Sequence, residues 1–286
     1  MFSKINHMAR RIPKTQFIRW ILFHYGRLAF WIPEAYPDFL SIGAARAGTT
    51  WLHARLSQHP QIYLPRSKEM HFFDVAPHDK PLRIEYDLSK ESHWRWYYMV
   101  YGGKGNLIKG DVTPAYMLLS EERIRAIKKK MPNVRIILII RNPIDRAWSG
   151  LRRGLWFRNA KRPSDIGTSN DLRPVLMTPE ILDRGDYISS IKKWEKHVPE
   201  DRIMYVFFED LFKKPRPYLS EICKFLGVDA AGLPNSWDEN AKINAAPPDP
   251  IPAVLHDELR KLYRKQISFL EQKFSRNLSH WLSDRY

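Results

Sequence analysis

Residues that could bind an anion gather in one short segment, 43–50. Its side chains are small except for Arg46, and it ends in Gly48 followed by two threonines, Thr49 and Thr50. Free backbone N–H groups at a helix start, together with the positive end of the helix dipole, favour a phosphate or sulfate. The sequence therefore predicts an anion cradle between an apolar strand and a helix, with Arg46 as its cation.

The spacing of this segment, G-x-x-x-x-G-T-T, nearly matches the nucleotide-triphosphatase loop G-x-x-x-x-G-K-[ST]. Thr49 stands where that loop has its lysine, and the cation, Arg46, comes before Gly48 instead. We therefore expect a ligand whose charge is arranged differently from the β and γ phosphates of ATP.

A second candidate anion site follows the apolar run 134–140, which is typical of a strand buried on both faces of a parallel sheet. A magnesium-dependent triphosphatase usually has an acid near the end of such a strand, whereas this one ends in Arg141. Asn142 can cap a helix that begins at Pro143, and Ser149 falls two turns later on the face toward the strand end. Arg141 and Ser149 are predicted to bind a second phosphate, with no metal required.

With these two segments the chain resembles the sulfotransferases that use 3′-phosphoadenosine 5′-phosphosulfate (PAPS). Residues 45–51 are similar to their 5′-phosphosulfate loop, and 141–149 are similar to their 3′-phosphate segment. The sequence K-E-M-H-F-F-D at 68–74 is similar to the heparan-sulfate and bacterial branch of this family. Further motifs extend the resemblance over roughly residues 38–230; they lie at 110–116, 185–187, 208–211 and 225–227.

The resemblance implies PAPS as the sulfuryl donor and adenosine 3′,5′-bisphosphate (PAP) as the product. It implies that Glu69 is the catalytic base, assisted by Arg46, with His71 as a structural hydrogen-bonding residue and the natural substitute for Glu69. Trp51 either stacks on adenine or packs in the core. No metal site is expected. The implied cofactor-binding residues are Arg46, Ala47, Gly48, Thr49, Thr50, Trp51, Arg141 and Ser149.

Two positions depart from the family pattern. The family usually has lysine where this chain has Arg46, and a guanidinium keeps a fixed charge and cannot donate a proton, although it can still promote transfer electrostatically. Val112 stands where the heparan-type enzymes have a lysine. The acceptor is therefore left open among carbohydrate, glycolipid and natural-product hydroxyls, or an amine.

The order of patterns predicts an α/β fold, a three-layer sandwich with a central parallel sheet. Strands are expected around 38–42, 134–140 and 202–208, and helices at 121–130, 143–157, 216–226 and 255–274. Ligands then bind at the carboxyl ends of the strands. The proline-broken stretches 159–180 and 234–252 are candidate lids over an acceptor cleft. At 286 residues and 44% hydrophobic content, one sulfotransferase domain over 37–286 is expected.

The first 36 residues form a separate basic, aromatic segment with six Lys or Arg residues against Glu34. Its apolar stretch, 18–32, is too interrupted for a spanning helix and lacks the features of a secretory signal. The segment either packs on the domain or lies at an anionic membrane surface.

The formal net charge of +16 calls for anionic partners, and the excess is dense at 141–162, beside the second predicted phosphate site. No zinc-finger or RNA-recognition signature accompanies the charge, so no nucleic-acid partner is expected. A P-loop-type kinase or triphosphatase, and a non-catalytic protein that binds anionic glycans or membranes, remain the alternative functions.

Cys223 is the only cysteine, so no disulfide can form within the chain. Its neighbours have helical spacing, which predicts a small core residue. A cytoplasmic, reducing location is therefore favoured.

Overall fold

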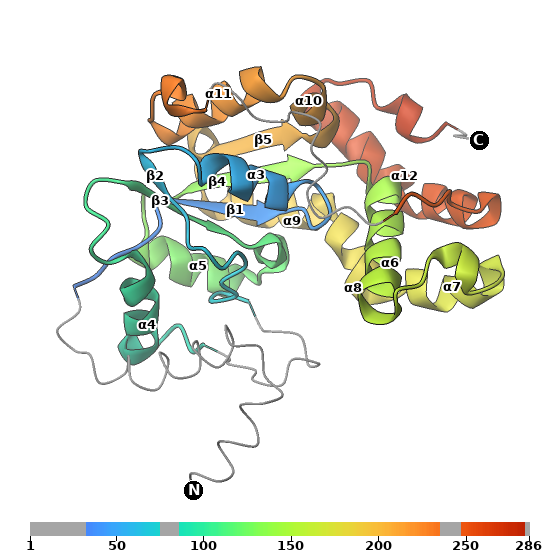
Figure 1. The fold of residues 1–286 in the computed structure, drawn as a ribbon, viewed down its shortest axis with the longest axis horizontal. Helices are drawn as coiled ribbons and strands as arrows, with labels where there is room; N and C mark the ends of the chain where they lie inside the picture. The colour runs from blue at the N-terminus through green and yellow to red at the C-terminus, as the bar shows by residue number, and fades with distance from the viewer. Residues whose placement is uncertain (1–32, 75–85, 235–246, 284–286) are drawn as a thin grey trace, which may run out of the picture.

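Five parallel strands form the centre of the computed structural model, which describes residues 33–74, 86–234 and 247–283 (Figure 1). In space the strands follow the order β2-β3-β1-β4-β5. The paired residues place β1 between β3 and β4, with all neighbouring strands parallel. The bounds are β1 (Phe39–Gly43), β2 (Ile62–Tyr63), β3 (Ile108–Val112), β4 (Arg135–Ile140) and β5 (Ile203–Phe207).

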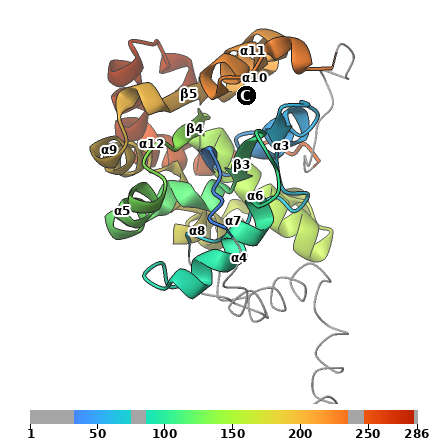
Figure 2. The same ribbon diagram turned by 90° about the vertical axis from the view of Figure 1, so that its left-hand side faces the viewer.

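Helices cover both faces of the sheet (Figure 2). One face carries α3 (Thr49–Leu56), α10 (Phe208–Lys213) and α11 (Pro215–Leu226), and the other carries α5 (Glu121–Lys130) and α9 (Tyr187–His197). This coverage explains why every residue of β1, and every residue of β4 after Arg135, is buried. The predicted three-layer α/β fold is confirmed.

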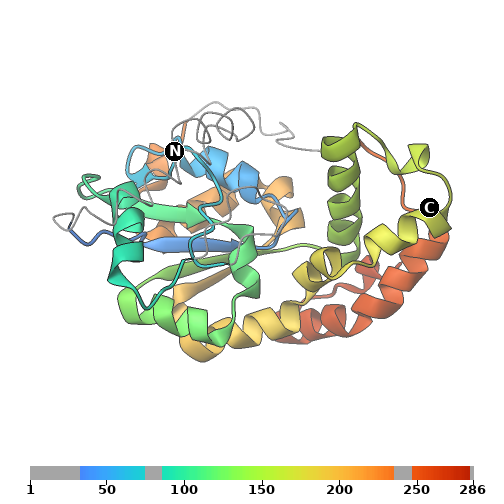
Figure 3. The ribbon, with the colours of Figure 1, turned by 90° about the horizontal axis from the view of Figure 1, so that it is seen from below.

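The remaining helices lie at the two ends of the sheet. At the carboxyl ends of the strands are α6 (Pro143–Asn159), α7 (Ser169–Leu176) and α8 (Pro179–Leu182), with the 3₁₀ turn η3 (Asp183–Gly185) after α8 (Figure 3). The long α12 (Ala253–Phe274) packs against α6 and α9. On the side of β2 and β3 lies α4 (Glu91–Tyr101).

Local capping chemistry sets the helix starts that the sequence predicted. The Ser120 side chain accepts from the backbone N–H of Arg123 at the start of α5. The Asn142 side chain accepts from the N–H of Ile144 at 3.0 Å, and Pro143 occupies the first helical position of α6. These caps turn the chain from β4 into α6 directly after Arg141.

The stretch 159–180 contains more helix than its composition indicated. Two of its prolines occupy first helical positions, Pro163 in a short 3₁₀ turn and Pro179 in α8, while Pro174 lies inside α7. Leu172 and Leu176 bury the inner face of α7. The stretch is thus anchored to the core, beside α6 and α12. Most of the other predicted lid, at 235–246, lies outside the described residues.

The basic N-terminal segment falls largely outside the described residues as well, so its predicted packing or membrane contact stays a prediction. At its described end, the Tyr36 ring packs edge-on against Trp94 and Tyr98. None of the helices in the described ranges is long and apolar enough to cross a membrane.

Candidate functional site

The loop between β1 and α3 turns sharply at Gly48, which precedes α3 in the left-handed region with φ of 84°. A Cβ placed there would lie 2.8 Å from the Phe212 ring, so glycine is required both by φ and by space. No side chain caps the first turn of α3. The start of α3 therefore offers its N–H groups to an anion, as the sequence predicted.

Arg46 and Ser149 meet in the structure although 103 residues separate them. The Arg46 Nε–H donates to Ser149 Oγ at 3.2 Å, and an Nη1–H of Arg141 donates to the Arg46 backbone carbonyl at 2.5 Å. The two predicted anion sites are thus adjacent at the carboxyl edge of the sheet. Arg46 links them.

Arg141 is held from two sides. Its guanidinium lies 4.4 Å from the centre of the Phe208 ring. The Tyr187 hydroxyl accepts from the Arg141 backbone N–H at 3.1 Å and donates to the Arg141 carbonyl at 2.9 Å. Sequence reasoning noted Tyr187 and Phe208 only as parts of motifs. Their contact with Arg141 depends on how α9 and α10 fold back onto β4.

Positive charge is crowded at this edge. Burial, together with the charges of Arg153, Arg141 and Arg152, lowers the pKa of Arg46 to about 10. Burial likewise lowers the pKa of Arg141. An anion bound here would relieve this repulsion, so the cluster favours a negatively charged ligand.

The segment that carries Glu69 is tied to the end of β3 by three backbone N–H groups. Glu69 donates to the Val112 carbonyl at 3.2 Å, Met70 to Thr113 Oγ1 at 3.0 Å, and Phe72 to the Tyr116 hydroxyl at 3.0 Å. Glu69 and His71 have left-handed φ values of 65° and 52°, which are unusual for residues other than glycine. Such strained backbone is concentrated at functional sites.

Two neighbours keep the Glu69 carboxylate charged. Lys68 Nζ contacts Glu69 Oε1, and His71 Nε2 lies 3.5 Å from Glu69 Oε2. Burial favours the neutral acid, but the hydrogen bond from His71 and the charge of Lys68 outweigh it and lower the pKa of Glu69 well below its usual range. His71 is in turn oriented by Asp74, whose Oδ2 lies 2.7 Å from His71 Nδ1.

Asp111 lies below this segment, without access to solvent. Its carboxylate accepts hydrogen bonds from the hydroxyls of Tyr97 and Tyr116 at 2.9 Å and of Thr113 at 2.7 Å. Burial raises the pKa of Asp111. Thr113 and Tyr116 are the same side chains that accept from the Glu69 segment, so Asp111 fixes the position of that segment from underneath.

A cavity of about 160 Å³ brings five of the predicted site residues together: Arg46, Thr49, Thr50, Glu69 and His71. Ser149 and Arg141 do not line this cavity, but each forms a hydrogen bond with Arg46, which does. Three further cations, Lys68, Arg153 and Arg184, also line this cavity.

Three further predicted cofactor residues, Ala47, Gly48 and Trp51, also do not line this cavity. Ala47 is buried, and Trp51 is only 1% exposed. The Trp51 ring packs 5.2 Å from the Phe212 ring, with the Arg55 guanidinium over it. This packing accounts for Trp51, and its contact with adenine stays a prediction. Gly48 contributes through its backbone.

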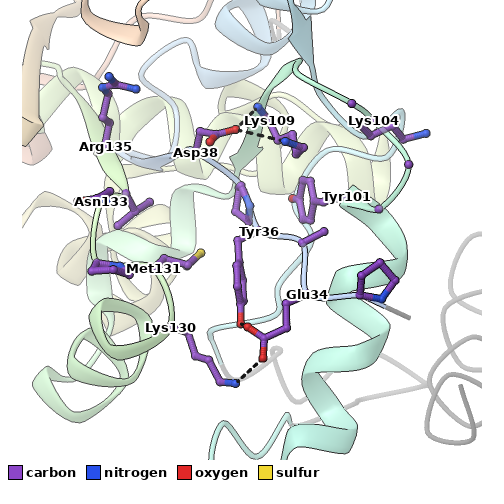
Figure 4. A pocket seen from close by; sticks show the side chains of 18 of the residues that line it. Glu34, Tyr36, Asp38, Tyr101, Lys104, Lys109, Lys130, Met131, Asn133 and Arg135 are labelled. Carbon is purple, nitrogen blue, oxygen red and sulfur yellow. Dashed lines mark hydrogen bonds and ion pairs between the residues drawn. The ribbon is translucent and has the colours of Figure 1, made fainter. Parts of the chain in front are cut away.

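Another cavity, of about 680 Å³, lies at the opposite edge of the sheet, where the strands begin (Figure 4). Its cations have partners: Lys130 lies 3.6 Å from Glu34, and Lys109 lies 3.8 Å from Asp38. Arg202 donates to the Asn133 carbonyl at 2.8 Å. Size alone therefore does not make this cavity the site, because the phosphate loop and Glu69 are at the other edge.

Within the described ranges, no group of three or more His, Cys, Asp or Glu side chains could hold a metal ion. Cys223 is fully buried on α11, as predicted, and burial raises its pKa to about 11. It is therefore a core residue and no candidate nucleophile.

Comparison with known proteins agrees with this geometry. Residues 36–245 match the family model described as sulfotransferase domain. Heparan sulfate glucosamine 3-O-sulfotransferase 3A1 of Homo sapiens is 28% identical over 71% of this chain and 48% of its own length. Bifunctional heparan sulfate N-deacetylase/N-sulfotransferase 4 of Mus musculus is 26% identical over 67% of this chain and 22% of its own length. The chain thus spans about half, or less, of these relatives.

Among solved structures, a sulfotransferase from Alicyclobacillus acidocaldarius has the same fold, with a TM-score of 0.65 and 24% identity over 87% of this chain and 100% of that one. The family model covers well over half of the sequence, including the phosphate loop, the Glu69 segment and the Arg141 segment. The chain belongs to the sulfotransferase domain family.

Proposed function

We propose that this protein transfers the sulfuryl group of PAPS to a hydroxyl of an acceptor. The observation that carries this proposal is one cavity lined by both the phosphate loop, with Arg46, Thr49 and Thr50, and the ionised Glu69. A group donor bound at the loop would therefore face a carboxylate that can accept a proton.

The cofactor would use the two adjacent anion sites. The loop amides, the threonine hydroxyls and Arg46 would hold the 5′-phosphosulfate, while Arg141 and Ser149 would hold the 3′-phosphate. These groups supply donors and positive charge by themselves, so we infer that binding needs no divalent metal.

In the reaction the acceptor oxygen forms a bond to sulfur while the bond from sulfur to the 5′-phosphate oxygen breaks. The acceptor proton passes to Glu69, and the electron pair of the broken bond stays on the phosphate oxygen of PAP. The acceptor hydroxyl becomes more acidic as its bond to sulfur forms, so a carboxylate of low pKa can still take the proton. Arg46 and the loop donors stabilise the charge that builds on the leaving oxygen.

The heparan sulfate sulfotransferases named above support a carbohydrate hydroxyl as the first acceptor to try, although glycolipid and natural-product hydroxyls fit the same chemistry. A cytoplasmic location fits the buried, reduced Cys223. We also propose that residues 1–36, which are rich in basic and aromatic side chains, contact an anionic membrane.

The family match supports sulfuryl transfer over the rival functions. A nucleotide kinase or triphosphatase would need a loop lysine at position 49, where this chain has threonine, and an acid at the end of β4, where it has Arg141. A protein that only binds anionic glycans or membranes would not explain why Glu69 is held in strained backbone beside the loop.

Nucleotide titrations of Arg141→Ala test the placement of the cofactor. The variant should bind PAP at least 10-fold more weakly, since a charged hydrogen bond to the 3′-phosphate is lost, but should bind adenosine 5′-phosphate nearly as the wild type does. Arg125→Ala, on the exposed side of α5, is the matched control and should bind both nucleotides normally. Equal losses of affinity for the two nucleotides would show that Arg141 does not bind the 3′-phosphate.

A further inference from the structure

One carboxylate beside the candidate phosphate sites has no role in the proposed transfer. Glu209 is the second residue of α10, directly after β5, and β5 pairs with β4 so that Phe207 lies opposite Ile140. This register brings Glu209 next to the peptide that follows Arg141. Its Oε2 is buried and, among the residues that the structure describes, has no hydrogen-bond partner. A buried carboxylate oxygen without a donor is costly, so its presence requires an explanation.

The Glu209 carboxylate holds the chain where β4 turns into α6. The backbone N–H of Asn142 donates a hydrogen bond to this carboxylate. The preceding N–H, that of Arg141, donates to the Tyr187 hydroxyl at 3.1 Å. Side chains from α9 and α10 thus hold two consecutive peptide groups. Because the Arg141 side chain leaves the backbone between them, Glu209 helps to set its direction.

Glu209 also compensates the charge of Arg141. The Arg141 guanidinium contacts two neutral groups, the Phe208 ring and the Arg46 carbonyl. Burial lowers the pKa of Arg141, and the charges of Asp145 and Glu209 act in the opposite direction. The two carboxylates therefore help to keep this buried guanidinium charged.

Four other parts of the fold bring a charged or titratable group near Glu209. These groups are Arg141 after β4, Asp145 on α6, Tyr187 on α9 and Arg276 after α12. Arg276 is already paired with Asp210, to which its Nη2–H donates at 2.7 Å. Burial raises the pKa of Glu209, the charge of Arg141 lowers it, and the charge of Asp145 raises it. Arg141 is therefore the cation that favours the ionised form of Glu209.

A bound 3′-phosphate would reverse this balance at Glu209. It would neutralise Arg141 and add negative charge near a carboxylate whose Oε2 has no donor. Both changes disfavour the ionised carboxylate. Glu209 would then take up a proton from solvent, with no other covalent change.

We propose that Glu209 is a positioning residue for the 3′-phosphate. As a carboxylate it orients Arg141 and balances its charge before the cofactor binds, and it takes up a proton from solvent when the 3′-phosphate arrives. This inference rests on the proposed use of PAPS and adds a proton-linked step to cofactor binding.

The coupling has a definite sign. The pKa of Glu209 is higher in the complex than in the free protein, so PAP binds most tightly below the free-protein pKa. Its affinity then falls as the pH rises between the two pKa values, by up to about tenfold per pH unit. A ligand without the 3′-phosphate, such as adenosine 5′-phosphate, should not show this dependence on Glu209.

Proton counting by calorimetry tests the linkage. PAP and adenosine 5′-phosphate are titrated into the full chain from about pH 5 to about pH 9, in two buffers that differ in ionisation enthalpy. On binding PAP, the wild type should take up more protons than Glu209→Gln, by up to about one. Protons of the ligand phosphates cancel in this comparison, because both proteins bind the same ligand. Glu221→Gln, at an exposed position of α11, is the matched control and should behave as the wild type.

Three outcomes would overturn the proton-linked role. The first is equal proton uptake by the wild type and Glu209→Gln with PAP at every pH. The second is an equal difference between these proteins with adenosine 5′-phosphate, which would detach the proton from the 3′-phosphate. The third is loss of the uptake in Asp145→Asn but not in Glu209→Gln, which would assign the proton to Asp145.

A second pair of variants tests the positioning. Glu209→Gln keeps an acceptor for the Asn142 N–H, whereas Glu209→Ala removes it. The alanine variant should bind PAP about 10-fold more weakly than the glutamine variant, the range for losing a hydrogen bond that orients a charged group. Normal affinity for adenosine 5′-phosphate shows that each variant is folded. Equal PAP affinity of the two folded variants would overturn the positioning role.

Two further results keep the inferences apart. If Glu209→Ala does not fold, the proton uptake of Glu209→Gln still decides the proposal. Failure of the wild type to bind PAP overturns the proposed function, and the role of Glu209 with it. Normal PAP binding with no dependence on Glu209 overturns this inference alone.

Discussion

Two neighbours hold the Glu69 carboxylate ionised at the edge of the phosphate loop. Glu69→Gln keeps the size of the side chain but removes the proton acceptor. We expect transfer to fall by roughly 100-fold or more, the usual range for losing a positioned base, while PAP affinity stays within about twofold. The measurements are the transfer rate and a PAP titration of the same variant.

Glu122→Gln, at an exposed position of α5, is the control and should keep full activity. If Glu69→Gln turns over at nearly the wild-type rate, the base is another group. His71, the nearest alternative, would then be tested by His71→Gln.

At the residue scale, the sequence predicted that Arg46 and Arg141 lie at the same edge of the sheet, because each follows a strand of one parallel sheet. It did not predict the contact between Arg46 and Ser149. The same reasoning missed Arg153 and Arg184. These two arginines lie on α6 and η3, whose approach to the loop depends on tertiary packing. No local spacing reports such an approach.

Gly48 determines the conformation of the loop between β1 and α3, and its substitution tests that role. Gly48→Ala combines a left-handed φ with a Cβ 2.8 Å from Phe212, so it should destabilise the fold by about 1–2 kcal/mol and weaken PAP binding. Gly103→Ala is the matched control: its φ is 69°, but a Cβ there meets nothing within 4 Å. It should cost less and leave PAP binding unchanged.

Chemical denaturation of both variants measures the free energy of unfolding, and titration with PAP measures the affinity. Equal destabilisation by the two substitutions would mean that φ strain alone matters at Gly48. Unchanged PAP affinity in Gly48→Ala would contradict the role of this loop as the anion cradle.

Asp111 links β3 to the Glu69 segment through Thr113 and Tyr116. Asp111→Asn keeps the shape but replaces one acceptor by a donor that faces hydroxyl donors. We expect a loss of stability of about 1–3 kcal/mol, the cost of unsatisfied buried polar groups, and a lower kcat at unchanged PAP affinity. Denaturant unfolding and steady-state kinetics measure these effects.

Asp38→Asn provides the comparison, because Asp38 caps the other end of β3 by accepting from the Lys109 N–H at 2.7 Å. It should leave kcat unchanged. A normal kcat in Asp111→Asn would show that the Glu69 segment keeps its position without this anchor.

At the element scale, helices and strands with a strong local sequence pattern were predicted, and those with a weak pattern were missed. The run at β4, the bounds of α5 and the start of α6 were predicted because a buried strand and two capped helices have strong local signals. The helix α4 was missed because its aromatic residues are buried on several sides, including Trp94, Trp96 and Tyr97, and so show no simple polar face. The helices within 159–180 were hidden by their prolines.

At the scale of the whole molecule, the two edges of the sheet, where the strands begin and where they end, differ in their charges. The strands begin beside a large cavity with paired charges and end at the crowded cations of the loop and of Arg141. This arrangement follows the rule that ligands bind at the carboxyl ends of parallel strands. The sequence predicted the three layers and the edge of the sheet where the candidate site lies. The full set of side chains that line the cavity there could be identified only from the folded chain.

The most direct test of the central claim is the unfolding free energy of the full chain with PAP, in the presence and absence of a chelator. PAP at 100 times its dissociation constant should add about 2.7 kcal/mol by mass action, and the chelator should leave this gain intact because both phosphate sites are made of amides, hydroxyls and arginines. A gain that requires magnesium, or an equal gain from ATP with magnesium at the same concentration, would contradict the assignment of this site to PAPS.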